Sequence, residues 1–106
     1  MICRIWRGWT TPENADAYQN VVHDQVIPAI EARRIAGFRH IDLMRRTGPE
    51  VEFTTIMWFD DVAAVKRFAG EEYARSHVPA AARAALARFE EQASHYEVLD
   101  RRPQHL

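Results

Sequence analysis

Four segments of the chain have the hydrophobic patterns typical of β-strands, at residues 2–9, 38–46, 51–59 and 94–99. The segment at 51–59 is the most β-prone, because its aromatic and β-branched residues suit a pleated, half-buried surface. Turn-forming residues at 47–50 join the second and third segments, so these two are expected to form a β-hairpin.

Helical periodicity occupies the segments between these strands. The first predicted helix begins at a threonine cap with Pro12 in its first turn, and Pro28 is expected to kink or break it. The second is expected after Asp60 or Asp61 and ends at Gly70, because glycine readily adopts the conformation that stops a helix. The third is expected to open at Pro79. One face of this third helix would carry Ala82, Leu86, Phe89 and Ala93.

The order of these elements is β-α-β-β-α(α)-β, with two consecutive helices before the last strand. It predicts an α+β protein with the ferredoxin-like βαββαβ fold and a four-stranded antiparallel sheet. A chain of 106 residues has the length of one domain, which we expect at 1–100, followed by a loose C-terminal tail at 101–106. Helices cover only one face of such a sheet, and the other face would expose Trp6 or Trp9 with its strand neighbours. We therefore expect a homodimer in which the sheet faces of two copies stack.

The composition limits the classes of function. The formal net charge is −1 and no block of like charges occurs, so we expect no nucleic-acid binding and no binding to an anionic membrane. Arginines interrupt the apolar N-terminal segment, which argues against a signal peptide or membrane span and favours a cytoplasmic protein. A single cysteine, and five histidines without a His-x-x-x-His pair, argue against a zinc site. We expect neither a metal nor another cofactor.

Short motifs in a characteristic order run along nearly the whole chain. They are Ile5-Trp-Arg-Gly8, Tyr18, Gly37-Phe38, Glu52-Phe53, Trp58, Phe68-Ala-Gly-Glu-Glu72 and His95-Tyr-Glu-Val98. In these motifs the chain resembles the antibiotic biosynthesis monooxygenase (ABM) family of the dimeric α/β-barrel superfamily. The resemblance implies a dimeric α/β barrel with a ligand pocket between the sheet and the helices of each subunit. It fixes no reaction, since members include cofactor-free oxygenases, haem-degrading enzymes and isomerases.

The residues support cofactor-independent oxygenation of an aromatic, quinol or polyketide-like small molecule. In that chemistry a base takes a proton from the substrate, and the resulting anion gives an electron to O₂. A histidine suits the base, and an arginine can hold the developing oxyanion. We therefore name His77 as the candidate base, with Tyr73 beside it on a predicted helical turn. Arg7 is the candidate oxyanion donor, provided that its strand face meets the helices. The candidate pocket residues are Gln25, Trp58, Phe68 and His23.

Two other functions stay open. A dimeric protein with the same barrel would bind a ligand, or serve in a stress response, without catalysing a reaction. The second alternative is a haem-binding or haem-degrading protein, because His77 occupies the position of the iron ligand in that branch of the family. That branch also uses an asparagine on the first strand and a tryptophan on the second helix. Arg7 replaces the asparagine here, and Arg67 or Phe68 replaces the tryptophan, so two of its three functional residues are absent.

Overall fold

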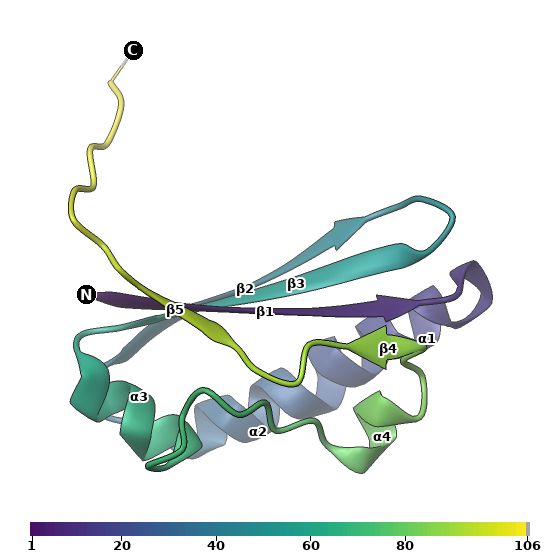
Figure 1. Cartoon of the computed structure of the whole chain (residues 1–106), viewed down its shortest axis with the longest axis horizontal. Helices are drawn as coiled ribbons and strands as arrows, with labels where there is room; N and C mark the ends of the chain where they lie inside the picture. Colours follow the sequence, from purple (N-terminus) through teal and green to yellow (C-terminus); the bar gives the residue numbers. More distant parts are fainter. Residues whose placement is uncertain (106) are drawn as a thin grey trace.

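All helices lie on one side of an antiparallel β-sheet in the computed structural model, which describes residues 1–105 (Figure 1). The strands are β1 (Ile2–Thr10), β2 (Phe38–Arg46), β3 (Val51–Phe59), β4 (Arg88–Phe89) and β5 (Ser94–Glu97). Their order in the sheet is β2-β3-β1-β4, and β5 also pairs with β1. The predicted α+β, ferredoxin-like fold is confirmed, but the sheet has five strands where four were expected.

The helix after β1 stays continuous through its proline. The helical elements are η1 (Pro12–Asn14), α1 (Ala15–Val21), η2 (Val22–Val26), α2 (Ile27–Ala32), α3 (Val62–Ala69) and α4 (Ala80–Arg83). Pro28 was expected to kink or break the first helix, but η2 accommodates it as a π-helix. The N–H of Ile27 donates to the carbonyl of Val22, five residues earlier. Within residues 1–105, no helix is both long and apolar enough to cross a membrane.

The third predicted helix is much shorter than expected. It ends at Arg83, and Phe89, which was placed on it, lies in β4 opposite Gly8. The backbone N–H of Ala87 donates to the carbonyl oxygen of Trp9 at 2.8 Å. This stretch therefore completes an otherwise unpaired edge of β1, and edge pairing overrides the helical spacing of its apolar residues.

Residues 90–93 interrupt what would otherwise be one strand made of β4 and β5. β4 pairs with the end of β1, and β5 pairs with its start. Glu90 still donates its N–H to the carbonyl of Arg7 at 3.0 Å, and residues 91–93 then turn away from β1 and bond to residues 74–76. The N–H of Ser76 donates to the carbonyl of Glu91 at 2.9 Å, and the N–H of Ala93 donates to that of Ala74 at 2.7 Å. Residues 74–76 are thus held beside the sheet. The helical turn predicted over 71–77 is reduced to one turn, closed by the bond from the Arg75 N–H to the Glu72 carbonyl at 3.1 Å, and residues 76–79 form no helix.

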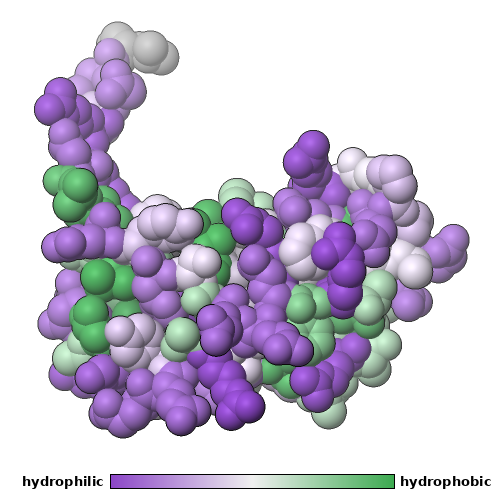
Figure 2. Space-filling model, viewed as in Figure 1, coloured by the Kyte–Doolittle hydropathy of each residue, from purple (hydrophilic) through white to green (hydrophobic). Residues whose placement is uncertain are grey.

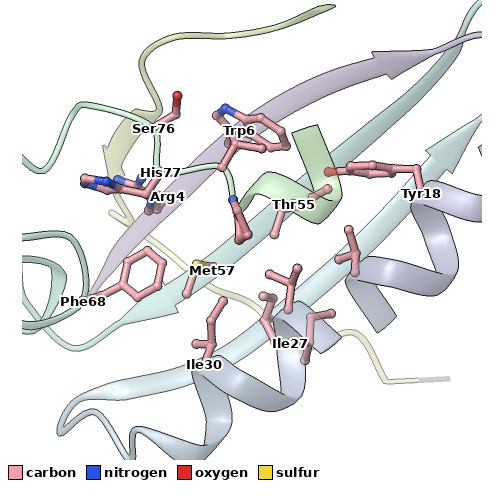
Figure 3. A pocket seen from close by; sticks show the side chains of 16 residues that line it. Arg4, Trp6, Tyr18, Ile27, Ile30, Thr55, Met57, Phe68, Ser76 and His77 are labelled. Carbon is pink, nitrogen blue, oxygen red and sulfur yellow. The ribbon is translucent and has the colours of Figure 1, made fainter. Parts of the chain in front are cut away.

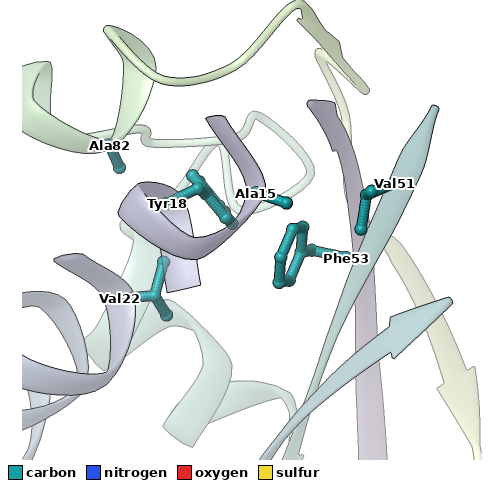
Figure 4. Packing of buried hydrophobic residues seen from close by; sticks show 6 residues of the cluster. All are labelled: Ala15, Tyr18, Val22, Val51, Phe53 and Ala82. Carbon is teal, nitrogen blue, oxygen red and sulfur yellow. The ribbon is translucent and has the colours of Figure 1, made fainter. Parts of the chain in front are cut away.

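The two faces of β1 divide as its alternation predicted. Arg4 and Trp6 face the helices, whereas Cys3 and Arg7 face the other side. On the helix side, Phe53 of β3 is fully buried, and its ring centroid lies 4.8 Å from that of Tyr18 on α1. The buried cluster around this contact holds α1 against the sheet (Figure 4). Its members are Ala15, Tyr18, Val22, Val51, Phe53 and Ala82.

The opposite face of the sheet carries no helix (Figure 1). Met44 and Tyr96, on that face, are 46% and 58% exposed. The C-terminal arm, residues 98–105, leaves the sheet on this side, and the guanidinium of Arg101 lies 4.8 Å from the ring centroid of Trp58. Figure 2 shows an arm that is mostly hydrophilic, with hydrophobic surface near its base. Large apolar groups therefore remain accessible on the outer face.

Candidate functional site

A cavity of about 90 Å³ lies between the sheet and the helices. Most of its wall is apolar, and three elements supply it: Trp6 and Met57 from the sheet, Ile27 and Ile30 from α2, and Phe68 from α3. Figure 3 shows Arg4, Ser76 and His77 gathered at one end, and the hydroxyl of Tyr18 pointing in from the other end beside Thr55. The cavity is thus apolar along its length and polar at both ends.

Arg4 is the buried charge of this cavity, with 5% of its surface exposed. Its guanidinium donates to the backbone carbonyls of Tyr73 and Arg75, and one nitrogen lies 3.0 Å from Nε2 of His95. It also lies 5.4 Å from the ring centroid of Phe68. Burial lowers the pKa of Arg4 to about 10, and no carboxylate among residues 1–105 forms an ion pair with it. Arg4 is therefore a fixed cation whose charge the described residues leave uncompensated.

His95 supports Arg4 from the neighbouring strand β5. Arginine only donates hydrogen bonds, so Nε2 of His95 accepts and the ring is neutral in this contact. The pKa of His95 is lowered mainly by burial and, to a smaller extent, by the charge of Arg4. The ring of Tyr73 meets the ring of His95 edge-on, with 5.1 Å between centroids. These groups hold the guanidinium in place without neutralising it.

Tyr18 supplies the polar group at the far end of the cavity. It is 2% exposed, and burial raises the pKa of its hydroxyl to about 12. The hydroxyl is therefore protonated at neutral pH and can donate a hydrogen bond. No side chain or backbone group among residues 1–105 accepts that bond, and in Figure 3 the oxygen points into the cavity.

His77 lies at the rim, where the side chain is partly in contact with solvent. Its Nε2 is 3.3 Å from the carbonyl oxygen of Ala69 at the end of α3. A carbonyl only accepts hydrogen bonds, so this nitrogen carries the proton and Nδ1 has a free lone pair. The segment that pairs with residues 91–93 brings His77 here, together with Ser76. The site thus has a potential base at its entrance.

Two of the residues predicted for the site line the cavity, His77 and Phe68. Tyr73 lies next to it, but its ring packs against His95, and its contribution to the site is the carbonyl that binds Arg4. Tyr73 and His77 were expected on one face of a helical turn. Tyr73 instead lies in a single turn closed by the bond from the Arg75 N–H to the Glu72 carbonyl, and His77 lies in the irregular segment after it, so one helical face does not hold both side chains.

Arg7 and Trp58 lie on the opposite face of the sheet, which corrects their expected places in the pocket. Arg7 is exposed, with its guanidinium 3.6 Å from the carboxylate of Glu90. Trp58 donates its indole N–H to Asp42 at 3.0 Å. The condition attached to Arg7 fails, because the helices cover the strand face that contains Arg4 and Trp6.

Gln25 and His23 lie outside the cavity as well. Both belong to the π-helix η2, and both are exposed. His23 contacts its neighbour Asp24, with 2.7 Å between Nδ1 and the carboxylate. The extra residue in the π turn rotates the helix, so that Val22 and Val26 face the cavity in place of Gln25.

The important residue that sequence reasoning missed is Arg4. Alternation along the first strand correctly separates Arg4 from Arg7, but it does not say which face the helices cover. One signal was available: the neighbours of Arg7 on the third strand include polar residues, whereas the face of Arg4 continues into Met57 and Phe59. Tyr18 was expected in the core, where most of it lies, and its free hydroxyl has no sequence signal.

Within residues 1–105, no group of three or more His, Cys, Asp or Glu side chains is arranged to hold a metal ion. The polar groups of the cavity are an arginine, a histidine, a serine, a threonine and a tyrosine. This set suits an anionic or hydrogen-bonding organic molecule.

Comparison with known proteins shows the fold. A scan of protein-family models and a search of curated proteins find no match to this chain. Among solved structures, a dimeric ferredoxin-like protein from an uncultured marine organism has a TM-score of 0.68 at 7% identity, covering 97% of this chain and 98% of that one. An EthD family protein from Bacillus halodurans has a TM-score of 0.60 at 16% identity, covering 93% and 100%. An antibiotic biosynthesis monooxygenase has a TM-score of 0.55 at 20% identity, covering 97% and 100%.

These similarities extend over nearly all of both chains in each comparison. The chain therefore has the ABM-like, ferredoxin-like α/β fold that the resemblance of its motifs implied. At these identities the likeness is one of fold, and the choice of reaction rests on the groups in the cavity.

Proposed function

We propose that the protein is a cofactor-independent monooxygenase that acts on a small aromatic or quinol substrate in the cavity between sheet and helices. The observation that carries the proposal is that one apolar cavity has both a potential base and a buried cation in its wall. The base is His77, whose Nδ1 is free at the rim, and the cation is Arg4. His77 takes a phenolic proton, and the positive charge of Arg4 favours the resulting oxyanion. The oxyanion role proposed for Arg7 passes to Arg4, which lies three residues earlier on β1.

A hydroquinone can supply every electron that this reaction needs. One molecule of benzene-1,4-diol and one of O₂ give one hydroxybenzoquinone and one water. In net terms C₆H₆O₂ and O₂ give C₆H₄O₃ and H₂O: the organic molecule loses two hydrogens, gains one oxygen and gives up four electrons. The first proton goes to Nδ1 of His77, and the electron-rich anion reduces O₂. No external reductant is required for this balance.

In this scheme the role of Tyr73 is to position the guanidinium of Arg4. Its backbone carbonyl accepts from the guanidinium of Arg4, and its ring packs on His95, which contacts the same guanidinium. Tyr73 therefore acts on the substrate through the placement of Arg4.

The cavity volume favours the small end of the expected substrates. About 90 Å³ is smaller than the cavity of about 150 Å³ that binds benzene, so a single aromatic ring is the largest core that the cavity can take without movement of its walls. Polyketide-like molecules and haem need sites of roughly 300 Å³ or more. They would require the segment around Ser76 and His77 to move outward. Single-ring quinols are therefore the first substrates to test.

A homodimer through the outer sheet faces is part of the proposal. The exposed Met44 and Tyr96, and the half-buried Trp9 and Trp58, form an apolar surface that a second copy would cover. A protein of this fold is described as dimeric. Stacking two such sheets would close the α/β barrel.

Oxygen uptake tests the proposed reaction. The purified protein is mixed with benzene-1,4-diol or methylhydroquinone, and O₂ consumption and quinone absorbance are followed against a blank without protein. We expect His77→Ala to lower the rate above the blank by at least about 100-fold, the usual effect of removing a general base. His23→Ala is the matched control, because His23 is exposed and outside the cavity. Equal rates in wild type and His77→Ala would contradict the proposal.

A ligand-binding protein without activity is the second candidate, and the exposure of His77 favours it. An active site that uses an oxygen-sensitive anion should exclude water, whereas the rim here is open to solvent. Saturable binding of a quinol without oxygen uptake above the blank would select this alternative.

A further inference from the structure

The cavity contains a buried cation that has no counterion among residues 1–105. Several other arginines of this protein pair with carboxylates at the surface: Arg39 lies 2.6 Å from Asp60, and Arg88 lies 2.9 Å from Glu50. Arg4 is 5% exposed and has only carbonyl and imidazole acceptors, all of them neutral, among the described residues. A desolvated charge costs free energy unless an opposite charge joins it. An anionic ligand in the cavity would supply that charge.

A second, independent observation also points to a ligand. The hydroxyl of Tyr18 lines the same cavity from the helix side, and this side chain is 2% exposed. No hydrogen bond to this hydroxyl occurs among residues 1–105, and its oxygen is not one of the fully enclosed atoms that lack a partner, so it is accessible from the cavity. In Figure 3 it points inward from the end opposite Arg4, across the apolar walls of Met57 and Ile27. A ligand that spans the cavity would satisfy both groups.

We propose that the cavity binds single-ring aromatic oxyanions, with the anionic oxygen on the guanidinium of Arg4 and a second hydrogen-bond acceptor at the hydroxyl of Tyr18. The ring lies between these groups, against the apolar wall that includes Met57 and Phe68. Carboxylates and phenolates share this chemistry, and both are included. The inference deepens the proposed function, on which it rests only for the choice of this cavity as the reaction site.

Calorimetric titration without oxygen tests the proposal, because it measures binding with no turnover. The probes are 4-hydroxybenzoate, its neutral counterpart 4-hydroxybenzamide, benzoate, which lacks the second polar group, and 4-nitrophenolate as the phenolate arm. We expect the wild type to bind 4-hydroxybenzoate at least about tenfold more tightly than the amide, as a charge-assisted hydrogen bond predicts. Binding of 4-nitrophenolate at a pH where it is ionised extends the site to phenolates, and its failure limits the site to carboxylates.

Substitutions distinguish direct binding of the anion to the Arg4 guanidinium from attraction by the positive charge of the protein in general. Arg4→Gln should remove the preference for acid over amide, and Arg4→Lys should restore part of it. The matched control is Arg7→Gln, three residues away on the exposed face of the same strand, which should keep the full preference. Tyr18→Phe should weaken 4-hydroxybenzoate about three- to tenfold and leave benzoate unchanged. Circular dichroism of each variant checks that it is folded, and the Arg4→Lys result stands if Arg4→Gln does not fold.

Several outcomes would overturn the inference. They are equal affinity for acid and amide, an unchanged preference in Arg4→Gln, an equal loss in Arg7→Gln, or no saturable binding of either anion. Its failure is distinguishable from that of the proposed function. A protein that binds the acid through Arg4 but never consumes oxygen keeps the inference and loses the reaction. A protein that oxidises neutral quinols but shows no preference for anions keeps the proposed reaction and loses the inference.

Discussion

Arg4 and Arg7 lie three residues apart on β1, and the sheet places them in opposite environments. Arg7 is exposed, and a carboxylate of Glu90 lies 3.6 Å from it. Arg4 is 5% exposed and has no carboxylate partner among the described residues. An exposed arginine with a partner is an ordinary surface ion pair of small energetic effect. A buried arginine whose hydrogen-bond partners are all neutral destabilises the protein without ligand, so its presence is better explained by an anionic ligand.

The same contrast holds for the whole sheet. The face that contains Arg4 carries the fully buried Phe53 and Phe59 under the helices. The face that contains Arg7 carries Met44 and Tyr96, which remain about half exposed. One face therefore stabilises the subunit and forms the cavity, and the other is free for association. Substitutions on the two faces should change different measured quantities.

The largest expected effect on stability is on the covered face. Phe53→Ala should lower the free energy of unfolding by about 3–5 kcal/mol, because it removes a fully buried ring that packs against Tyr18 and leaves a cavity. Chemical denaturation followed by circular dichroism measures this change. Ile56→Ala, on the outer face, is the control and should cost less than half as much when both variants are measured at concentrations where the dimer has dissociated. Similar losses for the two variants would contradict the division of roles between the faces.

The next largest effect concerns association through the outer face. Ile56→Asp places a charge at the centre of that face, beside Ile5 on β1, and should weaken dimerisation by at least about 100-fold. Sedimentation velocity over a range of concentrations measures the dissociation constant. Calorimetric titration with 4-hydroxybenzoate checks that the cavity on the other side still binds. A wild type that is monomeric at micromolar concentration, or a variant that dimerises normally, would refute this arrangement.

The fold was more predictable than the site, because the two depend on different information. Periodicity along the chain identified the hairpin, the glycine stop of α3 at Gly70 and the two faces of β1. It failed where pairing between distant segments decides the structure. Phe89 has the spacing of a helical residue, but the free edge of β1 draws it into β4. Such an edge can be recognised only when the other strands are in place.

The candidate site was harder to predict than the fold, because the position of most of its residues depends on how distant segments assemble. His77 and Phe68 line the cavity as expected, because Phe68 lies at the end of α3 and His77 in the segment after it, and the motifs there locate both. The assignment of Arg7 over Arg4 depended on which face of the sheet the helices cover, and a single strand does not contain that information. Gln25 was misplaced because a π turn shifts the helical wheel by one residue, and only the assembled helix shows that turn.

A smaller effect should distinguish a ligand-binding arginine from a structural one. Arg4→Met removes a desolvated charge, and we expect the free energy of unfolding without ligand to be unchanged or higher by on the order of 1 kcal/mol. Loss of the hydrogen bonds to the carbonyls of Tyr73 and Arg75 limits the gain. Arg7→Met should change stability by less than about 1 kcal/mol, as exposed ion pairs do. Denaturation curves measure both, and a loss above about 2 kcal/mol in Arg4→Met would make Arg4 a structural residue.

The smallest expected effect is a pH dependence that comes from His95, beside Arg4. Burial and the charge of Arg4 lower the pKa of His95 in the folded protein below the ordinary value of 6.5, so the unfolded chain binds its proton first as pH falls. The stabilising contribution of neutral His95 is therefore complete above about pH 6.5 and declines as pH falls through and below that value. We expect the melting temperature of the wild type to drop more than that of His95→Gln between pH 7 and pH 5. His40→Gln, exposed on the outer face, is the control and should follow the wild type. Parallel curves for wild type and His95→Gln would mean that Arg4 does not suppress protonation of His95, and the guanidinium would then be less firmly held at the end of the cavity than its contacts indicate.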